Sequence, residues 1–170
     1  MQHLLTLLGM EYVLSIKLRN YHWNITGMSF LPIHKLLGQH YNKLSDCIDK
    51  IAEHIRTHNI AAPGSSSELL RLNSMASSPI EEAPGKLINV ESAIQDLMYN
   101  HINIRSHINS FDKNNMDLAA QDLLSKLDKF HAKSIWILRA HIERVPNNSS
   151  AASPRTAALS SAVYPLPYMT

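Results

Sequence analysis

Residues 4–58 decide the fold, and they have the sequence LLTLLGMEYVLSIKLRNYHWNITGMSFLPIHKLLGQHYNKLSDCIDKIAEHIRTH. Apolar residues recur in it mostly at steps of three and four, which is the period of a helix that buries one stripe. The period breaks near Thr26 and Gly27, and Ser29 is placed to cap a second helix that runs to about His58. Because the break is short, the two predicted helices must form an antiparallel hairpin. The periodic apolar positions are Leu4, Leu7, Leu8, Tyr12, Leu14, Leu18, Tyr21 and Ile25 in the first helix, and Phe30, Ile33, Leu37, Tyr41, Leu44, Ile48, Ile51 and Ile55 in the second.

The rest of the chain predicts a second hairpin. Over residues 59–87 the period is lost, and prolines, glycines and a serine cluster indicate a long crossover with a short helix at residues 65–72. Helical periodicity returns from Asn89 to a polar turn at residues 112–115, and again from Met116 onward to Ile142. No segment has the alternation of a strand. Two antiparallel hairpins joined by a long crossover predict an all-α fold, a four-helix bundle.

Length and composition fit one folded unit followed by a tail. The chain has 170 residues, of which 45% are hydrophobic and 18% are charged, the balance of a globular domain. We expect the bundle to occupy residues 1–144, and a Pro-, Ser- and Ala-rich tail to occupy residues 145–170. The net charge of +2 is too small to imply nucleic-acid binding by itself.

The first helix and the cysteine content bear on location. Glu11, Lys17 and Arg19 interrupt the first apolar run before it could span a bilayer, and no basic stretch precedes that run. The single Cys47 excludes a disulfide framework within one chain and is expected to be a buried thiol. We therefore expect a cytoplasmic protein without membrane association.

Two histidines flank the turn of the first hairpin. His22 and His34 lie about equally far from Met28, so antiparallel helices bring their side chains level with each other. Imidazole is a good ligand for iron, zinc or copper. The neighbouring Trp23 is expected to be a core aromatic. The spacing of the two histidines predicts half of a metal site.

Two carboxylates on the second helix supply the other half. Asp49 and Glu53 are four residues apart and project from one face of the helix. Asp49 lies fifteen residues after His34, roughly 22 Å along a straight helix, so one chain cannot bring them together. A second copy, packed antiparallel across a two-fold axis near residues 41–43, could do so. Taken alone, these residues favour a plainer interpretation, in which the acidic pair is solvated and the histidines are structural.

Two longer motifs carry a family resemblance. Residues 20–34, NYHWNITGMSFLPIH, are followed at residues 48–56 by IDKIAEHIR, and HWN with ID-x-x-AE at this spacing is fairly specific. These motifs resemble the Dps family, the twelve-subunit mini-ferritins, and the similarity covers about residues 4–142. Further matching segments are Ala62-Pro63-Gly64-Ser65, Asn100-His101, Asp122-Leu123-Leu124 and Trp136-Ile137-Leu138-Arg139-Ala140-His141.

The resemblance implies a fold, an assembly and an activity. Members of the family are ferritin-like bundles in hollow dodecamers, which oxidise Fe(II), with hydrogen peroxide as the favoured oxidant, and store the Fe(III) mineral. Such a cage would protect DNA from oxidative damage. The resemblance places the catalytic metal ligands at His22 and His34 of one subunit and at Asp49 and Glu53 of its two-fold partner, in agreement with the cross-subunit geometry.

One position departs from the family pattern. The family usually has an aspartate one turn after the second histidine, but this chain has Gly38, which offers no side-chain ligand. We expect one firm metal site, with His22, Asp49 and Glu53, and one weak site. His40 points about 200° away from Gly38 around the helix and is a poor substitute. Zinc, which takes nitrogen and oxygen ligands in a tetrahedron, could compete with iron for the firm site.

The remaining titratable residues have weaker assignments. His54 and His58 share a helix face and are expected to stabilise the negative end of the helix dipole. Asp128 and His131 form a pair three residues apart, but the repeated Glu-x-x-His pattern of an intrasubunit di-iron centre is missing from the sequence. Three acidic residues near the fourth helix either cap its start or, as the resemblance implies, line a cation-admitting pore at a three-fold axis: Asp112, Asp117 and Asp122.

Three functions remain open on the sequence alone. The first is the iron-oxidising storage cage. The second is a nucleoid-associated DNA-binding protein, which is disfavoured because no basic arm precedes the first helix and Arg155 is the only charged residue after Arg144. The third is a zinc- or iron-binding cage that oxidises iron only weakly because of Gly38.

Overall fold

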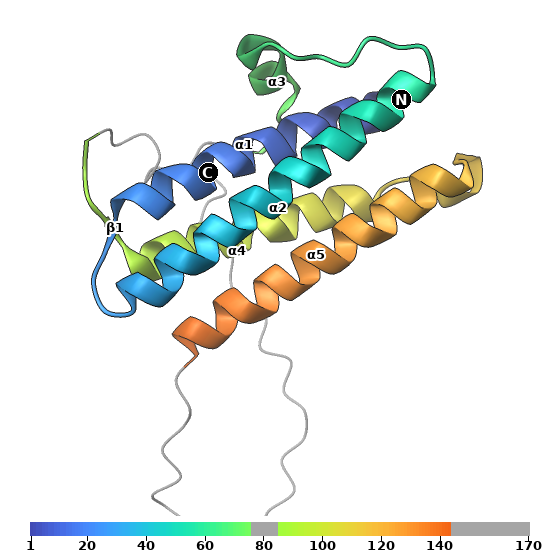
Figure 1. The fold of residues 1–170 in the computed structure, drawn as a ribbon. Helices are drawn as coiled ribbons and strands as arrows, with labels where there is room; N and C mark the ends of the chain where they lie inside the picture. Colours follow the sequence, from blue (N-terminus) through green and yellow to red (C-terminus); the bar gives the residue numbers. More distant parts are fainter. Residues whose placement is uncertain (76–84, 144–170) are drawn as a thin grey trace, which may run out of the picture.

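Four long helices and a short fifth one make up the part of the chain that the structure describes. The computed structural model describes residues 1–75 and 85–143, and Figure 1 shows its four long helices running alongside one another. The tail predicted at residues 145–170 lies outside these residues. The elements in chain order are α1 (Gln2–Asn24), β1 (Ile25–Thr26), α2 (Phe30–Thr57), α3 (Ser66–Leu72), β2 (Ile88–Asn89), α4 (Val90–Asn109), the 3-10 turn η1 (Lys113–Asn115) and α5 (Leu118–Ile142).

The helices α1 and α2 form the predicted hairpin, although not with the predicted cap. The chain turns through Gly27 and Ser29, whose φ angles of 117° and 65° are left-handed. Ser29 occupies the N-cap position of α2, but its side chain makes no capping hydrogen bond. A capping side chain usually needs an extended backbone at its own residue, which a left-handed serine lacks. Backbone bonds close the turn instead, from Phe30 N to Gly27 O and from Ile33 N to Ser29 O, each at 3.2 Å.

The helices α4 and α5 form the second hairpin, and each begins at a capping side chain. Asn89 Oδ1 accepts a hydrogen bond from the backbone N–H two residues further on at 2.8 Å. Asp117 Oδ1 accepts one from Ala120 N at 2.7 Å. Both contacts satisfy amide groups that a helix start leaves without partners. The helix α5 begins at Leu118, later than the predicted Met116, because η1 occupies the preceding turn.

The helix α1 is buried on every side around residues 7–11, whereas α2 buries a single stripe. Residues 7–11 are consecutive and all buried, and at 100° per residue they go fully round the helix. The helix packs against α2, α3 and α4. None of the described helices is long and apolar enough to cross a membrane. The largest fully buried side chains are Tyr21, Lys17, Leu7, Leu8, Leu14, Leu18, Ile25, Ile33, Leu37, Leu44, Ile51 and Ile55.

The crossover packs against α1 through α3, a short helix that the sequence predicted. A capping box starts it: Ser65 Oγ accepts from Glu68 N at 3.3 Å, and Ser65 N donates to Glu68 Oε2 at 3.1 Å. The contact with α1 falls at Gly9, where an added Cβ would lie 2.7 Å from Asn73 N and 2.8 Å from Leu69 O. The backbones therefore touch directly at this glycine.

A two-stranded parallel sheet also joins the hairpins, and it corrects the prediction that the chain has no strands. Ile25 pairs with Ile88, and Thr26 pairs with Asn89. Each strand has only two residues, which is too short for an alternating pattern to appear in the sequence. The pairing fixes the end of α1 beside the start of α4.

Candidate metal centre

The centre begins with two stacked imidazole rings on the first hairpin. His22 lies near the end of α1, and His34 lies in the second turn of α2. Their ring centroids are 3.7 Å apart, and the ring planes differ by 18°. Both side chains are half-buried, and the edge of the Tyr41 ring faces His22. The prediction that the hairpin places these two histidines level with each other is therefore confirmed.

Reciprocal hydrogen bonds fix the orientation of both rings. His22 Nδ1 donates to the His34 carbonyl oxygen at 2.7 Å, and His34 Nδ1 donates to the His22 carbonyl oxygen at 2.7 Å. A carbonyl oxygen can only accept, so Nδ1 carries the proton in each ring. Nε2 is therefore the ring nitrogen left to bind a metal ion, which imidazole does in its neutral form.

The two carboxylates lie elsewhere on α2 and are exposed. Asp49 and Glu53 are one turn apart. Neither has an ion pair or a side-chain hydrogen bond within residues 1–75 and 85–143. A single chain does not bring them to the histidines, because Asp49 is about 22 Å further along the helix axis than His34. The four predicted ligands thus form two separate half-sites in one subunit.

Gly38 lies directly beside the histidine pair. A Cβ atom at this position would be 3.3 Å from His22 Cε1 and 3.6 Å from His22 Nδ1. A carboxylate in place of this glycine would therefore enter the metal site. The chain has no side chain here, so this position cannot supply the ligand that the family pattern predicts.

Comparisons with known proteins agree with this fold. The model of the ferritin-like domain family, described as "Ferritin", matches residues 1–147. An uncharacterized low temperature-induced protein of Nostoc sp. is 30% identical over 150 residues, covering 86% of this chain and 81% of the relative. A DNA protection during starvation protein of Mycolicibacterium smegmatis is 27% identical over 135 residues, covering 76% of this chain and 69% of the relative. This chain is a Dps-type member of the ferritin-like family.

A solved structure extends the agreement to three dimensions. The crystal structure of antigen TpF1 from Treponema pallidum has a TM-score of 0.77 and 26% sequence identity, covering 84% of this chain and 90% of that one. The predicted fold, a ferritin-like all-α bundle with a long crossover, is therefore confirmed. Of the four residues predicted as metal ligands, His22 and His34 are half-buried, whereas Asp49 and Glu53 are exposed.

The interior of this Dps-type chain holds a polar network that sequence reasoning missed. His131 Nε2 is 2.8 Å from Glu11 Oε1, and His131 Nδ1 is 2.8 Å from His101 Nδ1. Glu11, His101 and His131 are fully buried, and they come from α1, α4 and α5. The predicted Asp128–His131 pair does not form, because Asp128 binds Arg105 at 2.8 Å instead. No spacing along the chain joins residues that are 120 positions apart.

The buried His40, the predicted buried thiol Cys47 and the aromatic Trp23 complete this description. His40 is buried, and burial together with the charge of His131 lowers its pKa to about 4. Cys47 is buried, and burial together with the nearby Glu11 charge raises the pKa of its thiol to about 11. Neither residue can serve the outer metal site. The prediction that Trp23 is a core aromatic is wrong, because its side chain is 69% exposed. Trp23 directly follows the half-buried His22, and successive side chains on a helix diverge by 100°.

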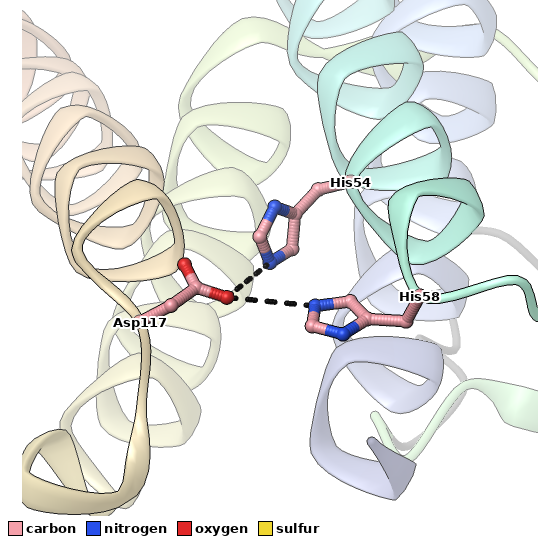
Figure 2. Close-up of side chains that lie close together, drawn as sticks. All are labelled: His54, His58 and Asp117. Carbon is pink, nitrogen blue, oxygen red and sulfur yellow. Dashed lines mark ion pairs between the residues drawn. The ribbon is translucent and has the colours of Figure 1, made fainter.

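A second cluster of ligand-type residues lies at the far end of α2. Figure 2 shows His54 and His58 pointing toward the carboxylate of Asp117 at the start of α5. Asp112 and Asp122, which were predicted together with Asp117 as cap or pore residues, do not join this cluster. Asp112 bonds to Asn114 and Asn115, and Asp122 bonds to Lys126. A three-fold pore lined by all three aspartates stays a prediction.

Proposed function

We propose that this protein is the subunit of an iron-storage cage that oxidises Fe(II), with hydrogen peroxide as its oxidant, at sites between two-fold-related subunits. Membership in the Dps group supports iron storage and DNA protection as the general class of function. The cage we propose is a dodecamer of identical subunits. It would protect DNA by removing Fe(II) and peroxide, which together damage it.

The observation that carries the proposal is the state of the histidine pair. Both rings are held through Nδ1 by backbone carbonyl groups, which leaves Nε2 as the atom of each ring that can bind a metal ion at a half-buried surface. The acceptor atoms are main-chain carbonyl oxygens, whose positions do not depend on side-chain rotamers. Two preorganised nitrogen donors side by side are a ready half of a site for a divalent transition metal.

The exposed carboxylates supply the charge that the histidines lack. Asp49 and Glu53 have no cationic partner within the described residues, so their negative charge is available to an incoming ion. When two α2 helices pack antiparallel about an axis near residues 41–43, these carboxylates come level with His34 of the other copy. Oxygen ligands favour Fe(II) and stabilise the higher charge of Fe(III).

Exposed apolar residues around the turn are consistent with a covered surface. Trp23, Met28, Phe30 and Leu31 are 69%, 94%, 40% and 56% exposed, and all four lie within the segment that connects the two histidines. Soluble monomers rarely expose so many large apolar side chains together. A second copy of the chain would cover them and complete the metal site in the same step.

The proposed reaction balances in electrons and protons. Two Fe(II) ions each lose one electron, and one hydrogen peroxide accepts both electrons and two protons, which gives two Fe(III) ions and two water molecules. Iron is the substrate here. Because Gly38 offers no ligand, we propose that one iron position is firm and the other is weak, so that oxidation is slower than with a full set of ligands.

The test is the rate of Fe(II) loss in stopped-flow experiments, with peroxide and with oxygen as alternative oxidants. The native chain is expected to exceed uncatalysed oxidation with peroxide, and Gly38→Asp is expected to raise the rate about tenfold by supplying the missing ligand. Gly38→Ala is the matched control, because it adds the same Cβ beside His22 without a carboxylate. A native rate equal to uncatalysed oxidation would overturn the proposal.

A further inference from the structure

The far end of α2 and the start of α5 bring three metal-ligand atoms together. His58 Nε2 lies 3.6 Å from Asp117 Oδ2, and His54 Nε2 lies 4.0 Å from the same oxygen. All three atoms lie within 4.8 Å of one another. Figure 2 shows that both rings direct an edge at one carboxylate oxygen.

We propose that His54, His58 and Asp117 form a binding site for a divalent transition metal of the zinc class, within a single subunit and separate from the iron-oxidising site. A tetrahedral zinc ion places its ligand atoms roughly 3.4 Å from one another. The two nitrogen–oxygen separations are 3.6 and 4.0 Å, and no pair of the three ligand atoms is more than 4.8 Å apart, so side-chain rotations can bring all three onto one ion. Three protein ligands leave a fourth position for water.

The local sequence suits this geometry. His54 and His58 are four residues apart on α2, a spacing that puts two imidazoles on one helix face and is used for zinc in His-x-x-x-His motifs. Here the intervening residues are Ile55, Arg56 and Thr57. The ring centroids are 5.1 Å apart with the planes at 79°, so the rings do not stack against each other and both edges stay available.

A buried nitrogen without a partner is the second observation. The side chain of His54 is 10% exposed, and its Nε2 atom is buried without any hydrogen bond within the described residues. Buried polar atoms almost always have a partner, so an orphaned one indicates a missing ligand or water. This atom points at Asp117 Oδ2 from too far for a hydrogen bond but at a distance that a bridging cation would span.

The carboxylate is held in place for this role. Asp117 is the N-cap of α5, and its Oδ1 accepts a hydrogen bond from Ala120 N at 2.7 Å, which leaves Oδ2 facing the histidines. That backbone bond, followed by the two histidines, keeps the pKa of Asp117 below its usual value, so the ligand is ionised. No lysine or arginine of the described segments forms an ion pair with Asp117, so the metal would have no competing cation there.

The site is distinct from the proposed iron site. From the histidine half of the iron site in the same subunit it is separated by about 30 Å along α2, since His54 is twenty residues after His34. Glu53 precedes His54 directly, but successive side chains on a helix diverge by 100°. A metal bound here would tie the end of α2 to the start of α5, two elements that otherwise make few contacts.

The experiment is a zinc titration of the assembled full-length protein, in competition with a chromophoric chelator. The parent is His22→Ala/Asp49→Asn, which removes a ligand from each half of the proposed iron site. It is expected to bind one zinc ion per subunit. His58→Ala and Asp117→Asn, each added to this parent, are expected to lower zinc affinity at least about tenfold. Asparagine is as good an N-cap as aspartate, so Asp117→Asn leaves the start of α5 intact.

The control is His141→Ala, which removes an exposed histidine of α5 and is expected to leave zinc affinity unchanged. Zinc is also expected to raise the melting temperature of the parent but not of His58→Ala, since binding to the folded state alone stabilises it. The proposal is overturned if the parent binds no zinc, if both ligand variants bind it as tightly as the parent, or if the control loses affinity equally. None of these outcomes depends on iron oxidation, which is measured separately on the native chain.

Discussion

Glu11, His131 and His101 form a hydrogen-bonded chain of fully buried side chains in the core. His131 has both ring nitrogens engaged, one with the Glu11 carboxylate and one with His101 Nδ1. Burial, then the charge of His131, then that of His40, lowers the pKa of His101 well below its ordinary value. His40 faces the same cluster from α2 at a ring-centroid distance of 6.1 Å from His101. The interior is therefore built for neutral imidazoles at His40 and His101.

These lowered pKa values make stability depend on pH in a defined direction. An unfolded histidine has a pKa of about 6.5 and binds a proton below it, whereas His40 resists protonation down to about 4. The unfolded chain then binds more protons, so the free energy of unfolding is greatest above pH 6.5 and falls as the pH drops toward 4. Each such histidine contributes about 1.4 kcal/mol per pH unit in that window.

His40→Leu is therefore expected to flatten the dependence of stability on pH. The expected change in slope between about pH 6 and pH 5 is about 1.4 kcal/mol per unit, measured by urea unfolding of the same assembly at each pH. His141→Leu, at an exposed histidine, is the control and is expected to keep the native slope. Equal slopes for His40→Leu and the native chain would show that His40 is not kept neutral by the fold.

On the scale of elements, the contact between α3 and α1 depends on the missing side chain of Gly9. A methyl group there would approach backbone atoms of Leu69 and Asn73 at under 3.0 Å, and backbone cannot rotate away. Gly9→Ala is expected to lower the free energy of unfolding by about 1–3 kcal/mol, a typical effect of overpacking. Chemical denaturation measures it.

Gly64→Ala is the matched control for this substitution. Gly64 lies in the same crossover, and an added Cβ would meet nothing within 4 Å. Its effect is expected to be neutral or slightly stabilising, about 0.4–1 kcal/mol, because alanine narrows the unfolded ensemble. Equal destabilisation by both substitutions would mean that the crossover does not pack on α1 as described.

The helices were predictable from sequence because apolar residues recur at steps of three and four along each of them. Predicted caps formed where the backbone is extended, as at Asp117, and failed at Ser29, where the backbone is left-handed and the hydroxyl makes no capping hydrogen bond. The two-residue strands left no pattern to detect. Rules based on neighbouring residues thus predict the helices, but they miss the features that depend on the geometry of a turn.

The candidate sites divide in the same way. The adjacency of His22 and His34 followed from a hairpin with a short turn, so sequence spacing was sufficient. The cluster of His54 and His58 with Asp117 did not follow, because it depends on which end of α5 packs against which end of α2. Spacing within one element or hairpin is informative, whereas contacts between the two hairpins need the folded structure.

At the scale of the whole molecule, the two hairpins have different roles. The α1–α2 hairpin carries all four residues proposed to bind iron, whereas α4 and α5 supply buried polar groups to the interior. The acidic half of the proposed iron site is exposed on α2 and cannot reach His22 or His34 of its own subunit. If the proposal is correct, an isolated subunit lacks a complete iron site, and only a two-fold pair of subunits oxidises Fe(II).

Subunit mixing tests this dependence directly. Chains with His22→Ala/His34→Ala and chains with Asp49→Asn/Glu53→Gln are each expected to lose peroxide-dependent Fe(II) oxidation in stopped-flow measurements. When the two are unfolded together and reassembled in equal amounts, half of the two-fold pairs are mixed, and each mixed pair has one intact site and one doubly defective site. About a quarter of the native activity is therefore expected to return.

The partial recovery distinguishes a shared site from a site within one chain. If each site took all of its ligands from one subunit, every site in the mixture would lack either the histidines or the carboxylates, and the mixture would stay as inactive as its components. Reassembly of each variant alone controls for recovery caused by refolding. Because no intact ligand set exists within either variant chain, activity in the mixture can arise only where the imidazoles of one subunit meet the carboxylates of another.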